Sequence, residues 1–120
     1  MKECLEKIFN QPISGVQIQV KLAPKSKWEA TTRRNKINLK VPCDTFFSHS
    51  GLVLEEYFHV LRQWGMGMTM LSYGLHDLRG HDKNKFEKEA DGFAKKHLPE
   101  LEKCLKCKIL SNFYFPSFSF

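Results

Sequence analysis

The stretch Lys36-Ile37-Asn38-Leu39-Lys40-Val41-Pro42-Cys43-Asp44 decides the fold, because the hydrophobic period of the chain changes within it. Up to Val41, apolar and polar residues alternate, which is typical of a strand with one buried face. Pro42 ends this pattern, and from Val53 to Trp64 the apolar residues recur with the spacing of a helix. We therefore predict strands before this stretch and helices after it, which makes an α+β domain.

Two other extended segments precede this strand. Residues 16–22 alternate in the same way, and residues 27–32 form a second extended run. Arg34-Asn35 is predicted to be a tight turn, because asparagine tolerates left-handed backbone angles. The first half is therefore predicted to be a small, mostly antiparallel sheet, preceded by a short helix over residues 2–9.

Helical spacing recurs through the second half of the chain. Ser50 is a favourable N-cap for the first helix. Pro99 is predicted to begin the last helix, because its missing N–H costs nothing in a first turn. The aromatic tail over residues 113–120 could pack back on the domain, extend a sheet edge or meet a partner. The helices are expected over residues 51–64, about 69–78, 85–97 and 99–107.

Length and composition exclude several classes of protein. The 120 residues suit one domain, and 42% hydrophobic with 27% charged residues is ordinary for a globular chain. No apolar run reaches the roughly 18–20 residues that span a bilayer, and the charged start lacks the apolar core of a secretory signal. We expect a single cytoplasmic domain over residues 1–112, with delivery as a secreted effector as the alternative.

The net charge of +6 comes from 19 lysines and arginines against 13 acids. The basic residues are spread along the chain with acids between them. We interpret them as a solvated surface, with nucleic-acid binding as an alternative. Five acids gather on two predicted helices, where such a cluster is costly without a cation. These acids are Glu55, Glu56, Glu87, Glu89 and Asp91.

The four cysteines are Cys4, Cys43, Cys104 and Cys107. Because no secretory signal is seen, a reducing compartment is expected and disulfides are not. Cys104-x-x-Cys107 could be half of a zinc site or a redox pair, but no second pair of this spacing completes four ligands. We interpret Cys104 and Cys107 as two unrelated thiols.

The candidate chemistry lies in Leu54-Glu55-Glu56-Tyr57-Phe58-His59, within the first predicted long helix. Glu55 and His59 are four residues apart and share a helical face, with Glu56 one step round the same side. This is the spacing of H-E-x-x-H, in which two histidines bind zinc and the glutamate is the general base. Here Glu55 stands in place of the first histidine.

A second segment, Asn84-Lys85-Phe86-Glu87-Lys88-Glu89-Ala90-Asp91-Gly92-Phe93-Ala94, follows on a later helix. With both segments, the chain resembles the compact gluzincin metallopeptidases of the ImmA/IrrE type. Those proteins carry H-E-x-x-H and then an E-x-E-A-(D/N)-x-F-A segment that supplies the third metal ligand. The resemblance, over about residues 37–98, implies a minimal zincin-like fold in which a helical hairpin carries the metal site.

The resemblance also implies roles for individual residues. Glu56 matches the catalytic glutamate, His59 the second histidine and Glu87 the third ligand. Asp91 matches the residue that orients a ligand histidine through its other nitrogen. With Glu55, the implied metal ligands are Glu55, His59 and Glu87, which suit zinc, or iron or manganese because two of them are carboxylates. The implied reaction is hydrolysis of a peptide or protein, with the strand over residues 36–41 along the cleft as an edge strand.

Several alternatives stay open. His49, His76 and His81 are candidates to replace the missing histidine, and Tyr73, His76 or His81 could stabilise a transition state, but spacing selects none of them. Glu87 and Asp91 could equally be solvated acids near a helix start. A catalytically inactive zincin-like module, acting as a binding or effector domain of bacterial, phage or toxin origin, is the main alternative to an enzyme.

Overall fold

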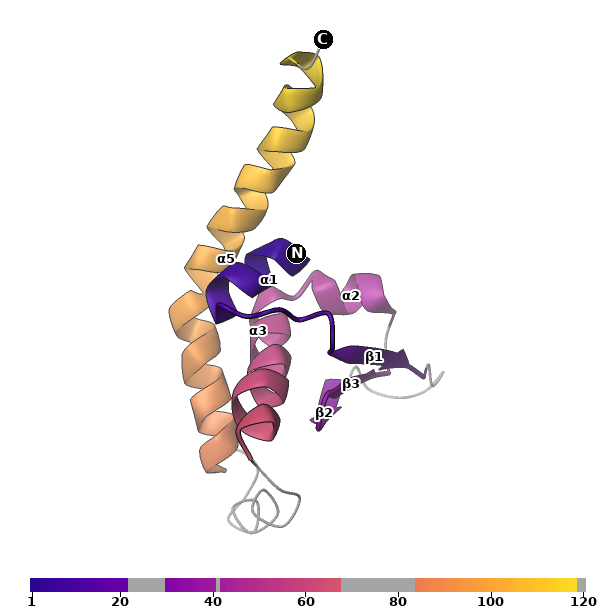
Figure 1. Cartoon of the computed structure of the whole chain (residues 1–120), viewed down its shortest axis with the longest axis vertical. Coiled ribbons are helices and arrows are strands. Elements are labelled where there is room, and N and C mark those ends of the chain that lie inside the picture. The colour runs from indigo at the N-terminus through magenta and orange to yellow at the C-terminus, as the bar shows by residue number, and fades with distance from the viewer. Residues whose placement is uncertain (22–29, 41, 68–83, 119–120) are drawn as a thin grey trace.

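The computed structural model describes residues 1–21, 30–40, 42–67 and 84–118, and for Arg33 and residues 108–118 it describes the backbone alone. A three-stranded sheet lies beside a group of packed helices (Figure 1). This arrangement confirms the predicted α+β fold. The predicted helix over about 69–78 lies outside the described residues.

The sheet consists of β1 (Gln17–Val20), β2 (Ala30–Arg33) and β3 (Lys36–Leu39), in the spatial order β1-β3-β2. β2 and β3 form an antiparallel hairpin, but β1 pairs in parallel with the other side of β3. The expectation of a mostly antiparallel sheet therefore holds for the hairpin alone. β3 is the central strand, so its predicted place as an edge strand along a cleft is wrong.

The turn between β2 and β3 lies where it was predicted, but another residue takes the left-handed conformation. Arg34 has a φ of 54°, and Asn35 does not have a positive φ. Beyond the turn, Ile37 and Leu39 are buried, while Lys36 and Asn38, which alternate with them, are partly exposed. β3 therefore has the alternation that its sequence predicts.

The first helices begin close to their predicted positions. α1 (Lys2–Phe9) ends at Asn10, which is left-handed with a φ of 55°. The short helix α2 (Cys43–Phe47) was not predicted. α3 (Ser50–Phe58) begins at the residue predicted as its N-cap, and His49 takes the capping position instead.

α3 does not end as a regular α-helix. It continues as the π-helical segment η1 (His59–Gln63) and the 3₁₀ turn η2 (Trp64–Met66). Gly67 then ends the helix with a φ of 104°, a value that glycine adopts without strain. The observed end is therefore close to the predicted one at residue 64, since the helical turns continue only to Met66.

α5 (Lys85–Phe118) is one helix of 34 residues, which corrects the prediction that a new helix begins at Pro99. Proline inside a helix costs about 3 kcal/mol. Leu98, Leu101 and Leu105 of this region pack on the core and offset that cost. The backbone of residues 113–118 is helical and leads away from the sheet (Figure 1), so the predicted boundary between 112 and 113 falls inside α5.

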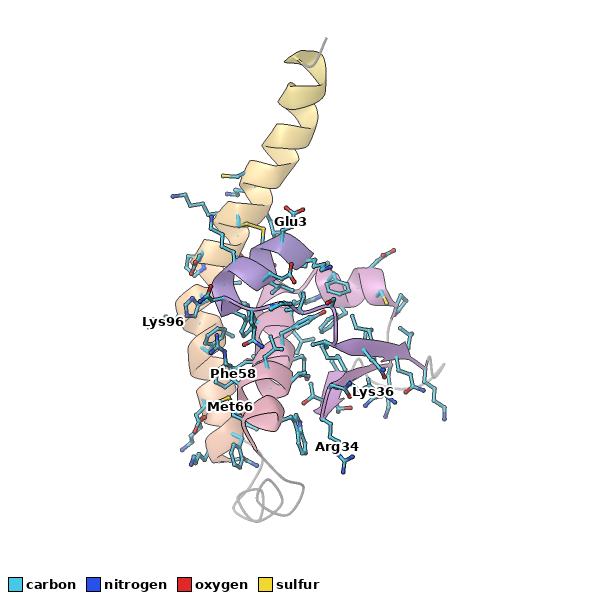
Figure 2. The ribbon with its side chains drawn as sticks, in the orientation of Figure 1. Glu3, Arg34, Lys36, Phe58, Met66 and Lys96 are labelled. Atoms are coloured by element: carbon cyan, nitrogen blue, oxygen red, sulfur yellow. A yellow bond between two sulfur atoms is a disulfide. The ribbon has the colours of Figure 1, made fainter. Side chains whose placement is uncertain are left out.

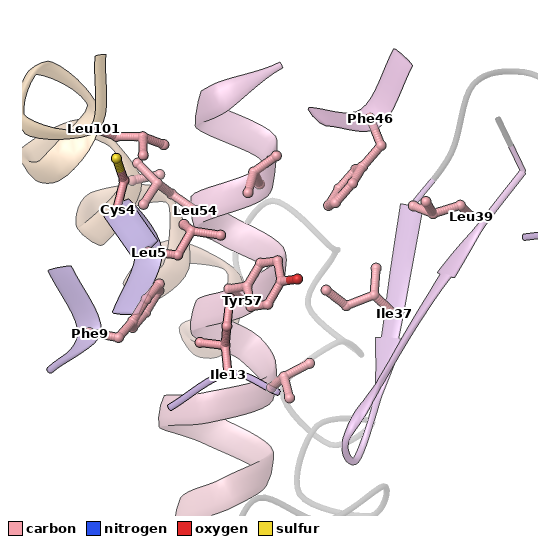
Figure 3. Close-up of a cluster of buried hydrophobic side chains, with 13 residues drawn as sticks. Cys4, Leu5, Phe9, Ile13, Ile37, Leu39, Phe46, Leu54, Tyr57 and Leu101 are labelled. Carbon is pink, nitrogen blue, oxygen red and sulfur yellow. The ribbon is translucent and has the colours of Figure 1, made fainter. Parts of the chain in front are cut away.

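The core surrounds α3, with α1 and α5 on one side of this helix and α2 and the sheet on the other (Figure 3). Phe93 of α5 stacks on Phe9 at 4.9 Å between ring centroids and lies 4.8 Å from Phe58, whose side chain is placed between the two long helices (Figure 2). A disulfide joins Cys4 to Cys104, with their Cα atoms 5.9 Å apart. The expectation that the chain has no disulfide is therefore wrong, because the fold brings α1 onto α5, while Cys43 and Cys107 are free thiols.

Within the described part of the chain, none of the helices is both long and apolar enough to cross a membrane.

Candidate functional site

Two helices supply the side chains of the candidate site. α3 carries Glu55 and Glu56, and His59 follows at the first position of η1. α5 packs along α3 with its first turn beside η1, which brings Glu87 opposite His59 (Figure 1). The helical hairpin expected from the sequence therefore brings the two sequence segments together.

Asn84 determines where α5 begins. Its side-chain Oδ1 accepts a hydrogen bond from the backbone N–H of Phe86 at 2.9 Å, and its carbonyl oxygen accepts one from Lys88 at 3.0 Å. This is the bonding of an N-cap residue. Asn84 is fully buried, so the cap also fixes the first turn against the domain. Glu87, the third residue of the helix, is held in place by this cap.

His59 and Glu87 face each other across the two helices. His59 Nε2 lies 3.3 Å from Glu87 Oε2, and the imidazole is buried while the carboxylate is partly buried. Two ligands that bind one tetrahedral zinc ion at about 2.0–2.1 Å lie about 3.3 Å apart. The pair therefore has the separation that two ligands of one metal ion require.

Gln63 holds the other side of the His59 ring. His59 Nδ1 lies 2.6 Å from Gln63 Oε1, and Gln63 Nε2 donates to the carbonyl oxygen of Phe86 at 2.7 Å. Both Gln63 and His59 are 4% exposed. Gln63 was not among the predicted site residues, although its spacing of four residues from His59 places it one turn away on the same face.

The π-helical segment begins at His59 and ends at Gln63. A π-helical turn is wider than an α-helical one and occurs in proteins mostly as a short insertion, often at a functional site. Here its two end residues are the hydrogen-bonded imidazole and amide. The widened turn therefore coincides with the part of the helix that faces α5.

Glu56 is a buried carboxyl group, 6% exposed, beside this pair. Its Oε2 atom has no hydrogen-bond partner among the described residues. Burial raises the pKa of Glu56 to about 8; His59 opposes this shift, and the charges of Glu87 and Glu55 add to it. Without a cation this carboxyl group is mostly protonated at neutral pH, and a positive charge beside it would lower its pKa.

Burial also affects His59, but other groups outweigh it. Desolvation by itself would lower the pKa of His59. The hydrogen bond and charge of Glu87, the hydrogen bond of Gln63 and the charge of Glu56 raise that pKa above its ordinary value. The site therefore attracts positive charge at the Nε2 side of the imidazole.

Glu55 turns toward Asp91 of α5. Burial raises the pKa of Glu55, and the charge and hydrogen bond of Asp91 raise it further. Two carboxyl groups can share a hydrogen bond only when one is protonated, and the raised pKa assigns the proton to Glu55. Asp91 also forms an ion pair with Lys95 at 2.9 Å. Asp91 was predicted to orient His59 through Nδ1. Gln63 takes that position instead, because Asp91 lies farther along α5, next to Glu55.

The described residues contain no group of three His, Cys, Asp or Glu side chains already arranged to hold a metal ion. Of the predicted ligands, His59 and Glu87 are in contact, and Glu55 lies near them but bonds to Asp91. His49 does not join them, since its Nδ1 lies 2.8 Å from the carbonyl of Thr45. Tyr73, His76 and His81 lie outside the described residues.

Among the described residues, basic side chains lie on several sides of the molecule. Arg34 and Lys36 lie at the hairpin of the sheet, whereas Lys96 lies on the opposite side of the molecule on α5 (Figure 2). A nucleic-acid interface would need such charges along one face. Their dispersal favours the interpretation of a solvated basic surface.

A scan against models of protein families, a search of curated proteins and a search of solved structures found no match to the chain.

Proposed function

We propose that the chain is a metallopeptidase-like domain of the gluzincin kind. His59 and Glu87 bind a divalent metal, Glu55 completes the ligand set after leaving Asp91, and Glu56 is the general base. The observation that carries this proposal is the approach of His59 Nε2 to Glu87 Oε2 at 3.3 Å from two separate helices. The same two residues stand at matching positions of the two sequence segments that resemble the family.

The residues present fit a metal in three respects. One imidazole nitrogen and one carboxylate oxygen already have the separation of two ligands. An oxygen of the buried Glu56 has no partner among the described residues, as an acid awaiting a cation would. The donor set of one nitrogen and two carboxylates suits zinc and also iron or manganese. As the third ligand, Glu55 would exchange its hydrogen bond with Asp91 for the metal.

In peptide hydrolysis, the residues of the site would have different roles. When bound, the metal supplies a Lewis acid that polarises the scissile carbonyl and lowers the pKa of water. Glu56 accepts the proton of the attacking water and returns it to the departing amine. His59 and Glu87 hold the reacting centre at the junction of the two helices.

The substrate would be an extended segment of a peptide or protein. β3 is paired on both sides, so its backbone is not available for a further strand. β2 is the edge strand in contact with α3 and η1. We therefore place the peptide along β2, where backbone hydrogen bonds would give affinity with little sequence preference.

The first test measures metal content. We expect near one equivalent of zinc, iron or manganese in protein purified with these metals supplied, and its loss in His59→Ala and in Glu87→Ala. Glu89→Ala is the matched control, since Glu89 is an exposed acid on the same helix, and it should keep its metal. A folded wild-type protein that takes up none of the three metals would refute the proposal.

The second test separates an enzyme from an inactive module, an alternative that the Glu55–Asp91 hydrogen bond favours. Glu56→Gln should abolish cleavage of a mixed peptide library while the metal content stays unchanged. Glu55→His restores the H-E-x-x-H pattern. If only this variant cleaves peptides, the natural chain is a binding module built on the same fold.

A further inference from the structure

The side chain of Gln63 connects both helices of the candidate site. Its Oε1 atom lies 2.6 Å from His59 Nδ1, and its Nε2 atom lies 2.7 Å from the carbonyl oxygen of Phe86. Phe86 directly precedes Glu87 in the chain. One amide group therefore contacts one candidate ligand directly and the backbone next to the other.

We propose that Gln63 is the positioning residue of this site: it fixes the tautomer of His59, so that Nε2 is the nitrogen left to bind the metal, and it ties the position of His59 to that of Glu87. The use of this arrangement for metal binding rests on the proposed function. The tautomer itself does not, because it is a property of the metal-free protein.

The chemistry of the three groups determines the direction of both hydrogen bonds. The Phe86 carbonyl can only accept, so the NH₂ end of the Gln63 amide must point to it. The amide oxygen then faces His59, and His59 Nδ1 must carry the hydrogen. In a neutral imidazole the other nitrogen, Nε2, is then unprotonated. Reversing the tautomer would break the bond to Gln63 or force its amide oxygen against the carbonyl.

Burial makes this preference strong. Gln63 and His59 are each 4% exposed, so water cannot easily replace a lost partner. A broken hydrogen bond between buried groups costs enough to change a population on the order of tenfold. Both groups also lie on the same π-helical turn, which limits how far they can move apart. Glu87 Oε2 is the competing acceptor at Nε2, but its contact of 3.3 Å is longer than the 2.6 Å contact of Gln63 with Nδ1. We therefore expect the Nδ1–H form to predominate in the neutral ring.

The test measures the tautomer by nitrogen NMR on metal-free protein labelled at histidine, at the high-pH end of the His59 titration. In the wild type we expect a protonated Nδ1 and an unprotonated Nε2. Gln63→Met has a similar shape without either hydrogen bond and should shift the population toward Nε2–H. Gln63→Glu keeps an acceptor for Nδ1 and should preserve the wild-type tautomer. Gln19→Met, at an exposed position of β1, is the matched control.

A wild-type ring with its hydrogen on Nε2 would overturn the proposal, and so would a folded Gln63→Met protein with an unchanged tautomer. Should Gln63→Met fail to fold, the wild type and Gln63→Glu still decide the question. In a parallel titration with zinc, we expect Gln63→Met to bind 10- to 100-fold more weakly than the wild type. A wild type that binds none of zinc, iron and manganese refutes the proposed function alone, whereas equal zinc affinity in both proteins refutes the positioning role.

Discussion

The two sides of the candidate site are held in different ways. On one side, His59 is fixed by Gln63, and Glu87 stands in the first turn of a capped helix. On the other side, Glu55 and Glu56 are carboxyl groups whose burial and mutual repulsion oppose ionisation. The folded chain by itself thus prepares the imidazole side, whereas on the carboxylate side burial keeps Glu56 mostly protonated at neutral pH until a cation is present.

The largest effect should come from Glu56. Its folded pKa of about 8 exceeds that of an unfolded glutamate, 4.5, so the native state binds the proton more tightly. This contribution to stability is complete below about pH 4.5 and is lost as the pH rises to about 8, by up to about 5 kcal/mol. Urea denaturation at pH 5, 6.5 and 8 should show this decline, reinforced by the raised pKa values of His59 and Glu55.

Glu56→Gln should flatten much of this decline, because the amide carries no charge at any of these pH values. Glu89→Gln, at the exposed control position, should decline as the wild type does. If the wild-type stability is constant between pH 5 and 8, the carboxylate side is not protonated in the native state. The proposed difference between the two sides of the site would then be wrong.

Removal of the disulfide should affect the two sides of the candidate site equally. Cys4 and Cys104 are 100 residues apart in the chain, and a cross-link over such a loop stabilises a protein by about 2–5 kcal/mol. We expect Cys4→Ser with Cys104→Ser to lower the free energy of unfolding by this amount, measured in urea, while Cys43→Ser leaves it unchanged. The His59 tautomer should stay as in the wild type, since the bridge lies far along α5 from Gln63.

Metal binding should release protons from the carboxylate side. At pH 7 Glu56 is mostly protonated, and a cation beside it would lower its pKa. Calorimetric titration with zinc in buffers of different ionisation enthalpy should show net proton release. Glu56→Gln should release up to about one proton fewer. Equal release by the two proteins would mean that Glu56 lies too far from the metal to be the general base.

The smallest effect is expected from the helix cap. Asn84→Ala removes the acceptor for the Phe86 N–H and should cost about 1–2 kcal/mol of stability in thermal or urea unfolding. Because the same turn carries Glu87, zinc affinity should also fall. Asn84→Asp keeps the acceptor and should retain most of the stability. If zinc affinity falls as much in Asn84→Asp as in Asn84→Ala, the cap does not determine the position of Glu87.

The sequence predicted what depends on local periodicity. Alternation located β3, the helical spacing located α3, and α5 begins at Lys85 as expected. The parallel pairing of β1 was not predictable, because alternation reveals a buried face and does not reveal the neighbouring strand. The single helix through Pro99 was missed because packing of distant side chains outweighed a local preference.

The candidate site likewise contains residues that the sequence predicts and others that only the fold reveals. Glu56 and His59 could be selected from their spacing on one helix, and Glu87 from the resemblance to the gluzincin family; the structure brings the three together. Gln63 could not be selected, since an amide acquires its role only from the carbonyl and the imidazole that the fold places on its two sides. The Cys4–Cys104 bridge was missed for a similar reason, because nothing local in either segment indicates that α1 lies on α5.

The bridge has a further consequence for the integrity of the molecule. Nearly every described segment up to the middle of α5, the candidate site included, lies between its two cysteines. A single backbone cut anywhere between them would therefore leave two pieces joined by a covalent bond. Such a nicked protein should migrate as one species in electrophoresis without reductant and separate into two fragments once a thiol is added.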